Sequence, residues 1–422
     1  MENFEVIGGN ELHGEIEVNG AKNFALKILP AIVLMSGKCK ITNLPFIEDI
    51  RRMLELLEDL GAKIESDESQ KTVEIDPTGI SKTALSETLV RKLRSSIILA
   101  GPMLSRFGEV KMSHPGGCVI GKRPIDMFLD GFGAFGAEVQ WEEEAFILKA
   151  KDGKLKGADI FFPKVTVTGT ETMVMAAVLA EGKTILRNAA MEPEISVLAE
   201  YLNSCGAKIK GAGSPTIEIE GVKEISGGEF RVIPDRIEAG TFVMMGLLTK
   251  SEITVKNCIP EHLGAVIPIL KKAGANLEIG EDYITTKKSD LIATSIATHE
   301  YPGFATDIQP PYTLLMTQAK GISIIHEAIF EGRLFFTDQL NTMGANIIMC
   351  DPHRVVVSGP TELYGKRLTS PDLRAGITMI LAGMIAKGKT VIDNIYQIDR
   401  GYEKIEERLQ KLGVDIKRVK EN

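Results

Sequence analysis

The chain has 422 residues, of which 44% are hydrophobic and 25% charged, a balance that is typical of globular proteins and excludes disordered and fibrous classes. This length predicts two domains, because a single hydrophobic core stops growing at roughly 250–300 residues. The formal net charge of -8 argues against nucleic acid as a partner, since nucleic-acid binders carry a basic domain or stripe.

The cysteines and the apolar runs indicate in which cellular compartment the protein is expected. The 5 cysteines are scattered, with no CxxC pair and no cysteine–histidine group at zinc-ligand spacing. Scattered cysteines are typical of a reducing compartment. The N-terminal segment is acidic and lacks the apolar stretch of a signal peptide, and the apolar run 376–386 is too short to span a membrane. We therefore expect a cytoplasmic protein.

A helical segment ending in Gly-Ala or Gly-Val occurs six times along the chain. The glycines that end these segments are Gly61, Gly136, Gly206, Gly274, Gly344 and Gly413. A second mark of strand character, such as MSGKCKITN or AKGKTVIDN, precedes each of them at a similar distance. Because the two marks recur together at a nearly constant spacing along the whole chain, they predict an internal repeat.

The first copy shows what one repeat contains. Its expected elements are, in chain order, a strand before Lys22, a helix over 22–35 bent at Pro30, a strand over 38–43, an amphipathic helix over 47–60, and strands over 62–66 and 72–76. Gly61 suits the left-handed cap of the second helix. Each repeat is thus a β-α-β-α-β-β unit. Two groups of three repeats predict an α/β protein with helices inside and sheets outside, a hinge near 221–234, and ligands in the cleft between two domains.

The segment PGGCVIGKRP holds three glycines and two prolines, so it predicts a loop, with Cys118 at its tip. Lys122 and Arg123 follow closely, and nearby cations lower the pKa of a thiol and make it reactive. The alternative is a small buried cysteine in a tight turn. We favour a functional thiol.

Three further patterns are candidates for chemistry. Lys22 and Asn23 begin a helix, where an anion is favoured. Asp307 follows a Pro/Gly turn and is either a general base or a helix cap. Four arginines recur near helix starts, as separate ion pairs or as one anion site: Arg94, Arg333, Arg374 and Arg400. The motifs GxxxxGK[ST], HExxH and GxSxG are missing, so ATP hydrolysis, zinc proteolysis and serine hydrolysis have no support.

With these motifs, the whole chain resembles the MurA-type UDP-N-acetylglucosamine 1-carboxyvinyltransferases, of the enolpyruvyl transferase family. The matching segments are GAKN, the loop GGCxIGxRPxD, PGFATD, DLRA and IDRGYEKIE. The resemblance implies an inside-out α/β barrel of six β-α-β-α-β-β repeats in two three-unit domains, with the active site in the interdomain cleft. It also implies that residues 1–21 plus 233–422 form one domain and 22–232 the other.

The family reaction transfers the enolpyruvyl group of phosphoenolpyruvate to the 3′-hydroxyl of UDP-N-acetylglucosamine and releases phosphate, the first committed step of bacterial peptidoglycan synthesis. The resemblance implies no metal and no cofactor, and inactivation by fosfomycin. We also expect no nucleic-acid partner, and we expect a monomer. The catalytic residues that it implies are Cys118, Asp307, Lys22 and Arg400. Those for phosphoenolpyruvate are Lys22, Arg94, Arg123, Arg333, Arg374 and Arg400. Those for the nucleotide sugar are Asn23, Arg94, Arg123, Pro124, Asp126, Met127, Lys164, Thr166, Val167, Thr168, Asp307 and the backbone of Ile329.

The sequence departs from the common family pattern at Lys27, Thr168, Asn341 and Gln397. None of these positions removes a catalytic group, so they bear on affinity and rate. Three other functions remain open: enolpyruvyl transfer to shikimate 3-phosphate, a non-catalytic paralogue that binds nucleotide sugar, and an RNA 3′-phosphate cyclase. The cysteine loop argues against the first, the intact catalytic residues against the second, and the six repeats and negative charge against the third.

Overall fold

The computed structural model of the chain describes residues 2–114 and 125–420, which form two compact units. Residues 20–114 and 125–233 form one, the N-terminal unit. Residues 2–19 and 234–420 form the other, the C-terminal unit. No helix in the described ranges is long and apolar enough to cross a membrane.

The described strands form six sheets, three in each unit. In the N-terminal unit the sheets have the orders β13-β3-β5-β4, β6-β8-β7 and β11-β12-β10-β9. Their strands are β3 (Cys39–Thr42), β4 (Lys63–Asp67), β5 (Thr72–Asp76), β6 (Glu109–Ser113), β7 (Ala137–Trp141), β8 (Ala145–Ala150), β9 (Asp159–Phe161), β10 (Lys183–Arg187), β11 (Lys208–Lys210), β12 (Thr216–Glu220) and β13 (Glu229–Arg231).

The C-terminal unit has the orders β15-β16-β14-β2, β17-β18-β20-β19 and β21-β22-β1-β23. Its strands are β1 (Glu2–Ile7), β2 (Gly14–Glu17), β14 (Ile253–Lys256), β15 (Asn276–Ile279), β16 (Tyr283–Lys287), β17 (Ile296–Ala297), β18 (Gly321–His326), β19 (Asn346–Asp351), β20 (Arg354–Gly359), β21 (Arg367–Thr369), β22 (Lys389–Asp393) and β23 (Asp415–Lys420).

Each repeat contributes one central helix and one second helix. The central ones are α1 (Lys22–Ala31) with η1 (Ile32–Leu34), η3 (Arg94–Leu99) with α4 (Ala100–Phe107), α6 (Val167–Ala177), α8 (Arg236–Leu248), η6 (Thr306–Ile308) with α10 (Gln309–Met316), and α12 (Leu373–Ile385). The second ones are α2 (Glu48–Leu60), α5 (Asp126–Ala134), α7 (Pro193–Ser204), α9 (Val266–Lys272), α11 (Thr337–Thr342) and α14 (Ile405–Gln410). Short helices complete the chain: η2 (Pro77–Gly79), α3 (Glu87–Lys92), η4 (Lys151–Gly153), η5 (Pro260–Leu263) and α13 (Tyr396–Asp399).

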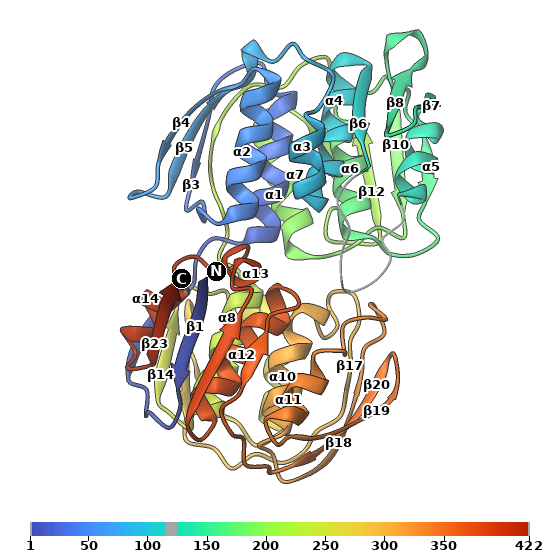
Figure 1. Cartoon of the computed structure of the whole chain (residues 1–422). Helices are drawn as coiled ribbons and strands as arrows, with labels where there is room; N and C mark the ends of the chain where they lie inside the picture. The colour runs from blue at the N-terminus through green and yellow to red at the C-terminus, as the bar shows by residue number, and fades with distance from the viewer. Residues whose placement is uncertain (1, 115–124, 421–422) are drawn as a thin grey trace. The chain divides into compact units, whose positions relative to one another are not determined.

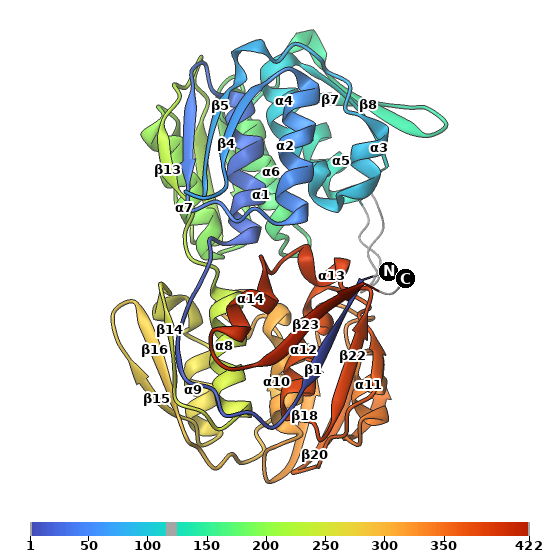
Figure 2. The same ribbon diagram turned by 60° about the vertical axis from the view of Figure 1, so that its left-hand side comes forward.

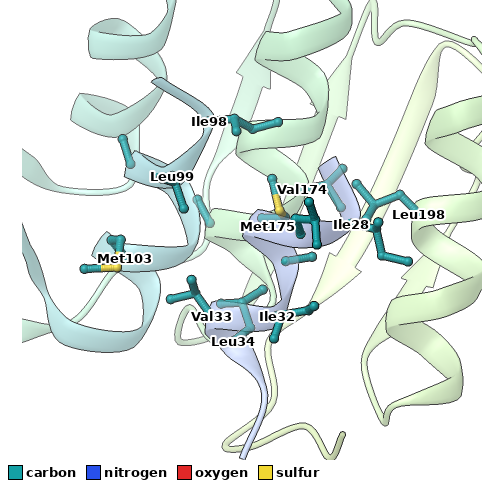
Figure 3. Close-up of a cluster of buried hydrophobic side chains, with 14 of the residues drawn as sticks. Ile28, Ile32, Val33, Leu34, Ile98, Leu99, Met103, Val174, Met175 and Leu198 are labelled. Atoms are coloured by element: carbon teal, nitrogen blue, oxygen red, sulfur yellow. The ribbon is translucent and has the colours of Figure 1, made fainter. Parts of the chain in front are cut away.

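The central helices lie inside and the sheets outside, as the repeat predicts. Every residue of 237–248 in α8 and of 374–384 in α12 is buried, because these helices are apolar nearly all round and have no face for water. In Figure 1, α1 and α6 lie between the strands β3–β5 on one side and β8 and β10 on the other, and Figure 2 shows the same molecule turned by 60°. In the N-terminal unit, side chains of the central helices interdigitate with Leu198 of α7 (Figure 3).

The repeat marks are confirmed as backbone features. All six marked glycines have positive φ, from 85° at Gly136 to 112° at Gly61, a conformation that only glycine adopts without strain. The second mark is an inner strand in five of the six described sheets, and in the remaining sheet it is the edge strand β6. The helix predicted over 22–35 ends at Ala31, after Pro30, and continues as a 3-10 turn.

The strand before Lys22 was predicted to open the first repeat, and this is wrong. That strand, β2, pairs in parallel with β14 of the fourth repeat. The first repeat is completed instead by β13, which pairs in parallel with β3. The buried side chain of Ile16 packs in the core of the C-terminal unit, which gives β2 an apolar face to cover there. Strand β1 likewise lies between β22 and β23 of the last repeat.

We predict that Gly61→Ala lowers the free energy of unfolding by about 1–3 kcal/mol, the cost of one strained backbone position. Gly61 has a φ of 112°, and a Cβ there would lie 2.6 Å from the carbonyl oxygen of Gly79. The matched control is Gly133→Ala in α5, where a Cβ meets nothing within 4 Å. Alanine at that helical position stabilises by roughly 0.5–1 kcal/mol. Urea unfolding of both variants measures the difference, and equal stabilities would contradict the left-handed cap.

Candidate active site

Many of the predicted site residues lie where the central helices begin. In the N-terminal unit these are Lys22 and Asn23 at α1, Arg94 at η3, and Lys164 and Thr166–Thr168 at α6. In the C-terminal unit they are Asp307 in η6 and Arg374 in the first turn of α12. Helix starts carry partial positive charge and unpaired N–H groups, so both sets suit anionic ligands.

The C-terminal unit brings together Arg333, Asp307 and Arg374. The two oxygens of the Asp307 carboxylate accept from different guanidinium groups, Oδ1 from Nη2 of Arg333 at 3.0 Å and Oδ2 from Nε of Arg374 at 3.0 Å. The arginines are only 3% and 4% exposed, whereas the Asp307 side chain is 24% exposed. The two arginines thus hold the carboxylate on its buried side, and its other side is accessible to solvent. The position that caps η6 is Ala305, so Asp307 is not the helix cap of the alternative prediction.

Two cations share this one carboxylate, so Asp307 neutralises only one of the two positive charges and the cluster can attract an anion. Nε and Nη1 of Arg333 are buried without a hydrogen-bond partner among the described residues. Burial alone lowers the pKa of Arg374, but the neighbouring Asp307, Tyr402 and Asp235 outweigh this effect and raise that pKa, so Arg374 stays a cation. Burial raises the pKa of Asp235, against the opposing effect of Arg374.

Arg400 lies beside the start of α12. It follows α13 and donates from Nη1 to Oε1 of Gln397 at 3.0 Å. A Cβ on Gly401 would lie 2.3 Å from Cδ1 of Leu373, so glycine allows this turn to pack closely against α12. Gln397, one of the departures from the family pattern, is therefore a hydrogen-bond acceptor for a predicted catalytic arginine.

Lys22 is buried at the start of α1, where its Nζ lies 2.8 Å from Oδ2 of Asp49. Asp49 lies in the first turn of α2, and the sequence reasoning missed it. The sequence feature that could have pointed to Asp49 is an acidic residue next to the apolar stripe of the helix over 47–60. The ion pair holds the lysine in place in the interior.

Several of the predicted nucleotide-binding residues lie at the starts of two neighbouring helices, α5 and α6. Thr166 caps α6 by accepting from the N–H of Gly169 at 3.2 Å, and the carbonyl of Thr168 accepts from the Thr172 hydroxyl at 2.7 Å. Asp126 and Met127 begin α5, which packs against α6. Cys118, Arg123 and Pro124 lie outside the described residues.

Glu327 is an organising residue that the sequence did not reveal. It is fully buried, and its carboxylate accepts from the hydroxyls of Thr298 and Thr306 and from the N–H groups of Ile329 and Phe330, at 2.9–3.1 Å. It therefore fixes the residue before Asp307 and the start of the loop that leads to Arg333. The N–H of Ile329 is used in this way, so its carbonyl is the backbone group left for a ligand.

Two departures from the family pattern have structural roles. Lys27 of α1 is buried, with its Nζ 2.9 Å from Oε2 of Glu171, a fully buried residue of α6. Asn341 bonds the N–H and the carbonyl of Ile347 at the start of β19. In the described ranges, no group of three or more histidine, cysteine, aspartate or glutamate side chains is arranged to hold a metal ion.

A family model described as EPSP synthase (3-phosphoshikimate 1-carboxyvinyltransferase) matches residues 6–409. The chain belongs to this family of enolpyruvyl transferases. Its full-length relatives are named UDP-N-acetylglucosamine 1-carboxyvinyltransferase. The relative from Desulforapulum autotrophicum is 44% identical over 100% of both chains, and that from Desulfatibacillum aliphaticivorans 45% over 100% of both. The relative from Coxiella burnetii (strain RSA 493 / Nine Mile phase I) is 42% identical, with 99% of this chain and 96% of that one covered.

Solved structures support the fold. The enolpyruvyl transferase NikO from Streptomyces tendae matches with a TM-score of 0.91 and 25% identity, covering 100% of this chain and 99% of that one. An EPSP synthase from Acinetobacter baumannii matches with a TM-score of 0.79 and 20% identity over 100% of both chains. The predicted family and the enolpyruvyl transferase fold are confirmed.

The buried pair of Lys27 and Glu171 predicts a pH dependence of stability. Burial raises the pKa of Glu171 to about 7 from an ordinary value of 4.5, with Lys27 opposing and Glu194 and Glu192 adding to the shift. A carboxyl with a raised folded-state pKa contributes stability that is full below about 4.5 and is lost as the pH rises through about 7. We therefore expect the free energy of unfolding to fall over this window in the wild type.

Glu171→Gln removes the titrating group, so its stability should depend less on pH between these values. Urea unfolding at pH 4.5, 6 and 7.5 measures the effect. Glu65→Gln, on an exposed position of β4, serves as the control and should keep the wild-type slope. A Glu171→Gln variant with the unchanged wild-type slope would show that Glu171 does not titrate in this window.

Proposed function

We propose that the chain transfers the enolpyruvyl group of phosphoenolpyruvate to the 3′-hydroxyl of UDP-N-acetylglucosamine, with release of phosphate. The reaction is the first committed step of peptidoglycan synthesis in the bacterial cytoplasm, and the enzyme acts as a monomer. The shared name of full-length relatives at 42–45% identity supports this acceptor. The observation that carries the proposal is the Asp307 carboxylate held between two buried guanidinium groups.

Phosphoenolpyruvate carries a phosphate and a carboxylate, so its site needs several cations. The assigned residues are Lys22, Arg94, Arg123, Arg333, Arg374 and Arg400. Arginine suits both anions because its planar fork binds two oxygens at once. Arg333 and Arg374 are held rigidly by burial and by Asp307, so they stabilise developing charge without reorganising.

Asp307 is the general base of the proposed mechanism. Its carboxylate takes the proton of the 3′-hydroxyl as that oxygen bonds to C2 of phosphoenolpyruvate, while Cys118 delivers a proton to C3. The product of this addition is a tetrahedral ketal. Breaking the bond between C2 and the phosphate oxygen then releases phosphate, and loss of a proton from C3 restores the double bond. Lys22 and Arg400 stabilise the charge on the phosphate as it leaves.

The nucleotide sugar is assigned to residues of both units. Asn23, Asp307 and the carbonyl of Ile329 contact the sugar. The diphosphate and uridine contact Arg94, Arg123, Pro124, Asp126, Met127, Lys164, Thr166, Val167 and Thr168. The start of α6 supports the anionic part, because helix N-termini favour phosphate. We also propose that residues 1–21 plus 233–422 and residues 22–232 act as the two domains of the enzyme.

We predict that phosphate release from phosphoenolpyruvate requires UDP-N-acetylglucosamine and continues in EDTA, since the proposed residues act without a metal. The comparison acceptor is shikimate 3-phosphate, because the family model is described by that reaction. Release with shikimate 3-phosphate alone would replace the proposed acceptor. No phosphate release with either acceptor would favour a non-catalytic paralogue that binds nucleotide sugar.

The role of Cys118 predicts the response to fosfomycin, a phosphoenolpyruvate analogue that alkylates thiols. The wild type should lose activity with time in the presence of the drug. Cys118→Asp should resist inactivation and keep measurable turnover, because aspartic acid still carries a proton to C3 but has no thiol. The control is Cys258→Ser, at a buried cysteine of the C-terminal unit, which should remain sensitive. Inactivation of Cys118→Asp at the wild-type rate would contradict the assignment.

A further inference from the structure

Tyr402 lies against the guanidinium group of Arg374 with both its hydroxyl and its ring. The side chain is buried, and its Oη lies 3.3 Å from Nη1 of Arg374. The guanidinium carbon lies 5.8 Å from the ring centroid. On its other side, the same Oη lies 3.3 Å from Oγ1 of Thr241 in α8. Tyr402 therefore connects the start of α12 to a different central helix.

The hydrogen bonds of this connection have a defined direction. Arginine has only donors, so the Tyr402 oxygen accepts from Arg374. Thr241 already donates its proton to the carbonyl of Ile237 at 2.8 Å. The hydroxyl of Tyr402 consequently donates to Thr241. The chain runs one way, from Arg374 through Tyr402 and Thr241 to the first turn of α8, and no member can reverse without losing a bond.

We propose that Tyr402 is a positioning residue that holds Arg374 in the orientation in which it grips Asp307. This inference rests on the proposed function and deepens it. Arg374 contacts Oδ2 of Asp307 through Nε and Nη2, each at 3.0 Å, while its third nitrogen, Nη1, contacts Tyr402. The plane of the guanidinium group is thus fixed at both ends.

Asp235 and Tyr402 act on Arg374 in different ways. The charge of Asp235 raises the pKa of Arg374, but its carboxylate also caps α8 by accepting from the N–H groups of Ile237 and Glu238. The positive charge therefore persists without Tyr402. The orientation of Nη1 does not persist without Tyr402, because a donor that loses its buried partner turns toward another acceptor.

The test is Tyr402→Phe, which removes the hydroxyl and keeps the ring. We expect kcat for enolpyruvyl transfer to fall roughly tenfold with KM within about twofold, because the lost hydrogen bond orients Arg374 toward the base, whereas the arginine keeps the charge that attracts phosphoenolpyruvate. The matched control is Tyr312→Phe in the same unit, another buried tyrosine, whose hydroxyl donates to the Thr294 carbonyl at 2.8 Å. It should lose stability and keep kcat. An unchanged kcat in Tyr402→Phe, or an equal loss in Tyr312→Phe, would overturn the positioning role.

A double-mutant cycle tests the contact without requiring turnover. In urea unfolding, Tyr402→Phe should cost much less stability in an Arg374→Met background than in the wild type, because the partner is already gone. Additive effects would overturn the proposal. Absence of turnover in the wild type with UDP-N-acetylglucosamine would contradict the proposed function, whereas wild-type turnover with an unaffected Tyr402→Phe variant would contradict only the positioning role.

Discussion

One carboxylate shared by two buried guanidinium groups is the constraint around which the C-terminal unit is arranged. Asp307 accepts from Arg333 and Arg374 at 3.0 Å each, and both arginines are almost completely buried. Removing one member of such a cluster leaves a buried charge without its partner, which costs about 3–5 kcal/mol. The cluster is therefore rigid before any substrate arrives. A rigid set of donors stabilises charge at a reaction centre more effectively than a set that must reorganise.

The repeat explains how three helix starts meet at this cluster. Arg374 begins α12, Asp307 lies just ahead of α10, and Asp235, which caps α8, acts electrostatically on Arg374. These helices come from three successive repeats, so their starts are equivalent positions of one structural unit. Burial of the helices on all sides leaves their ends as the places where polar groups gather. The same rule places Lys22 and Thr166 at helix starts in the N-terminal unit.

Local patterns in the sequence predicted the repeated elements well and their long-range partners poorly. The glycine that ends each second helix and the strand that precedes it depend on neighbouring residues, and both were correct. The pairing of β2 with β14 joins Ile16 to Val255 across most of the chain, and no local pattern specifies such a partner. The prediction that β2 belongs to the first repeat failed for this reason.

The candidate site shows the same difference between local patterns, which the sequence reveals, and long-range contacts, which it does not. The arginines near helix starts and Asp307 were identified, but as ambiguous groups with ordinary structural alternatives. The convergence of Arg333 and Arg374 on Asp307 became visible only in the fold. Asp49, Glu327 and Tyr402 were missed because each is distinguished by a tertiary contact and not by its neighbours in sequence. Lys27 appeared only as a departure from the family pattern, and its ion pair with Glu171 explains it. The assigned roles of Cys118 and Arg123 remain predictions.

The most direct test of the account is a single-turnover comparison of the wild type with Asp307→Asn. The variant keeps the size of the side chain and removes the base, so phosphate release should slow by at least roughly a hundredfold, the usual contribution of a general base. Binding of UDP-N-acetylglucosamine, followed by calorimetry, should be retained. Phosphate release at the wild-type rate in Asp307→Asn would contradict the claim that this carboxylate accepts the proton of the sugar hydroxyl.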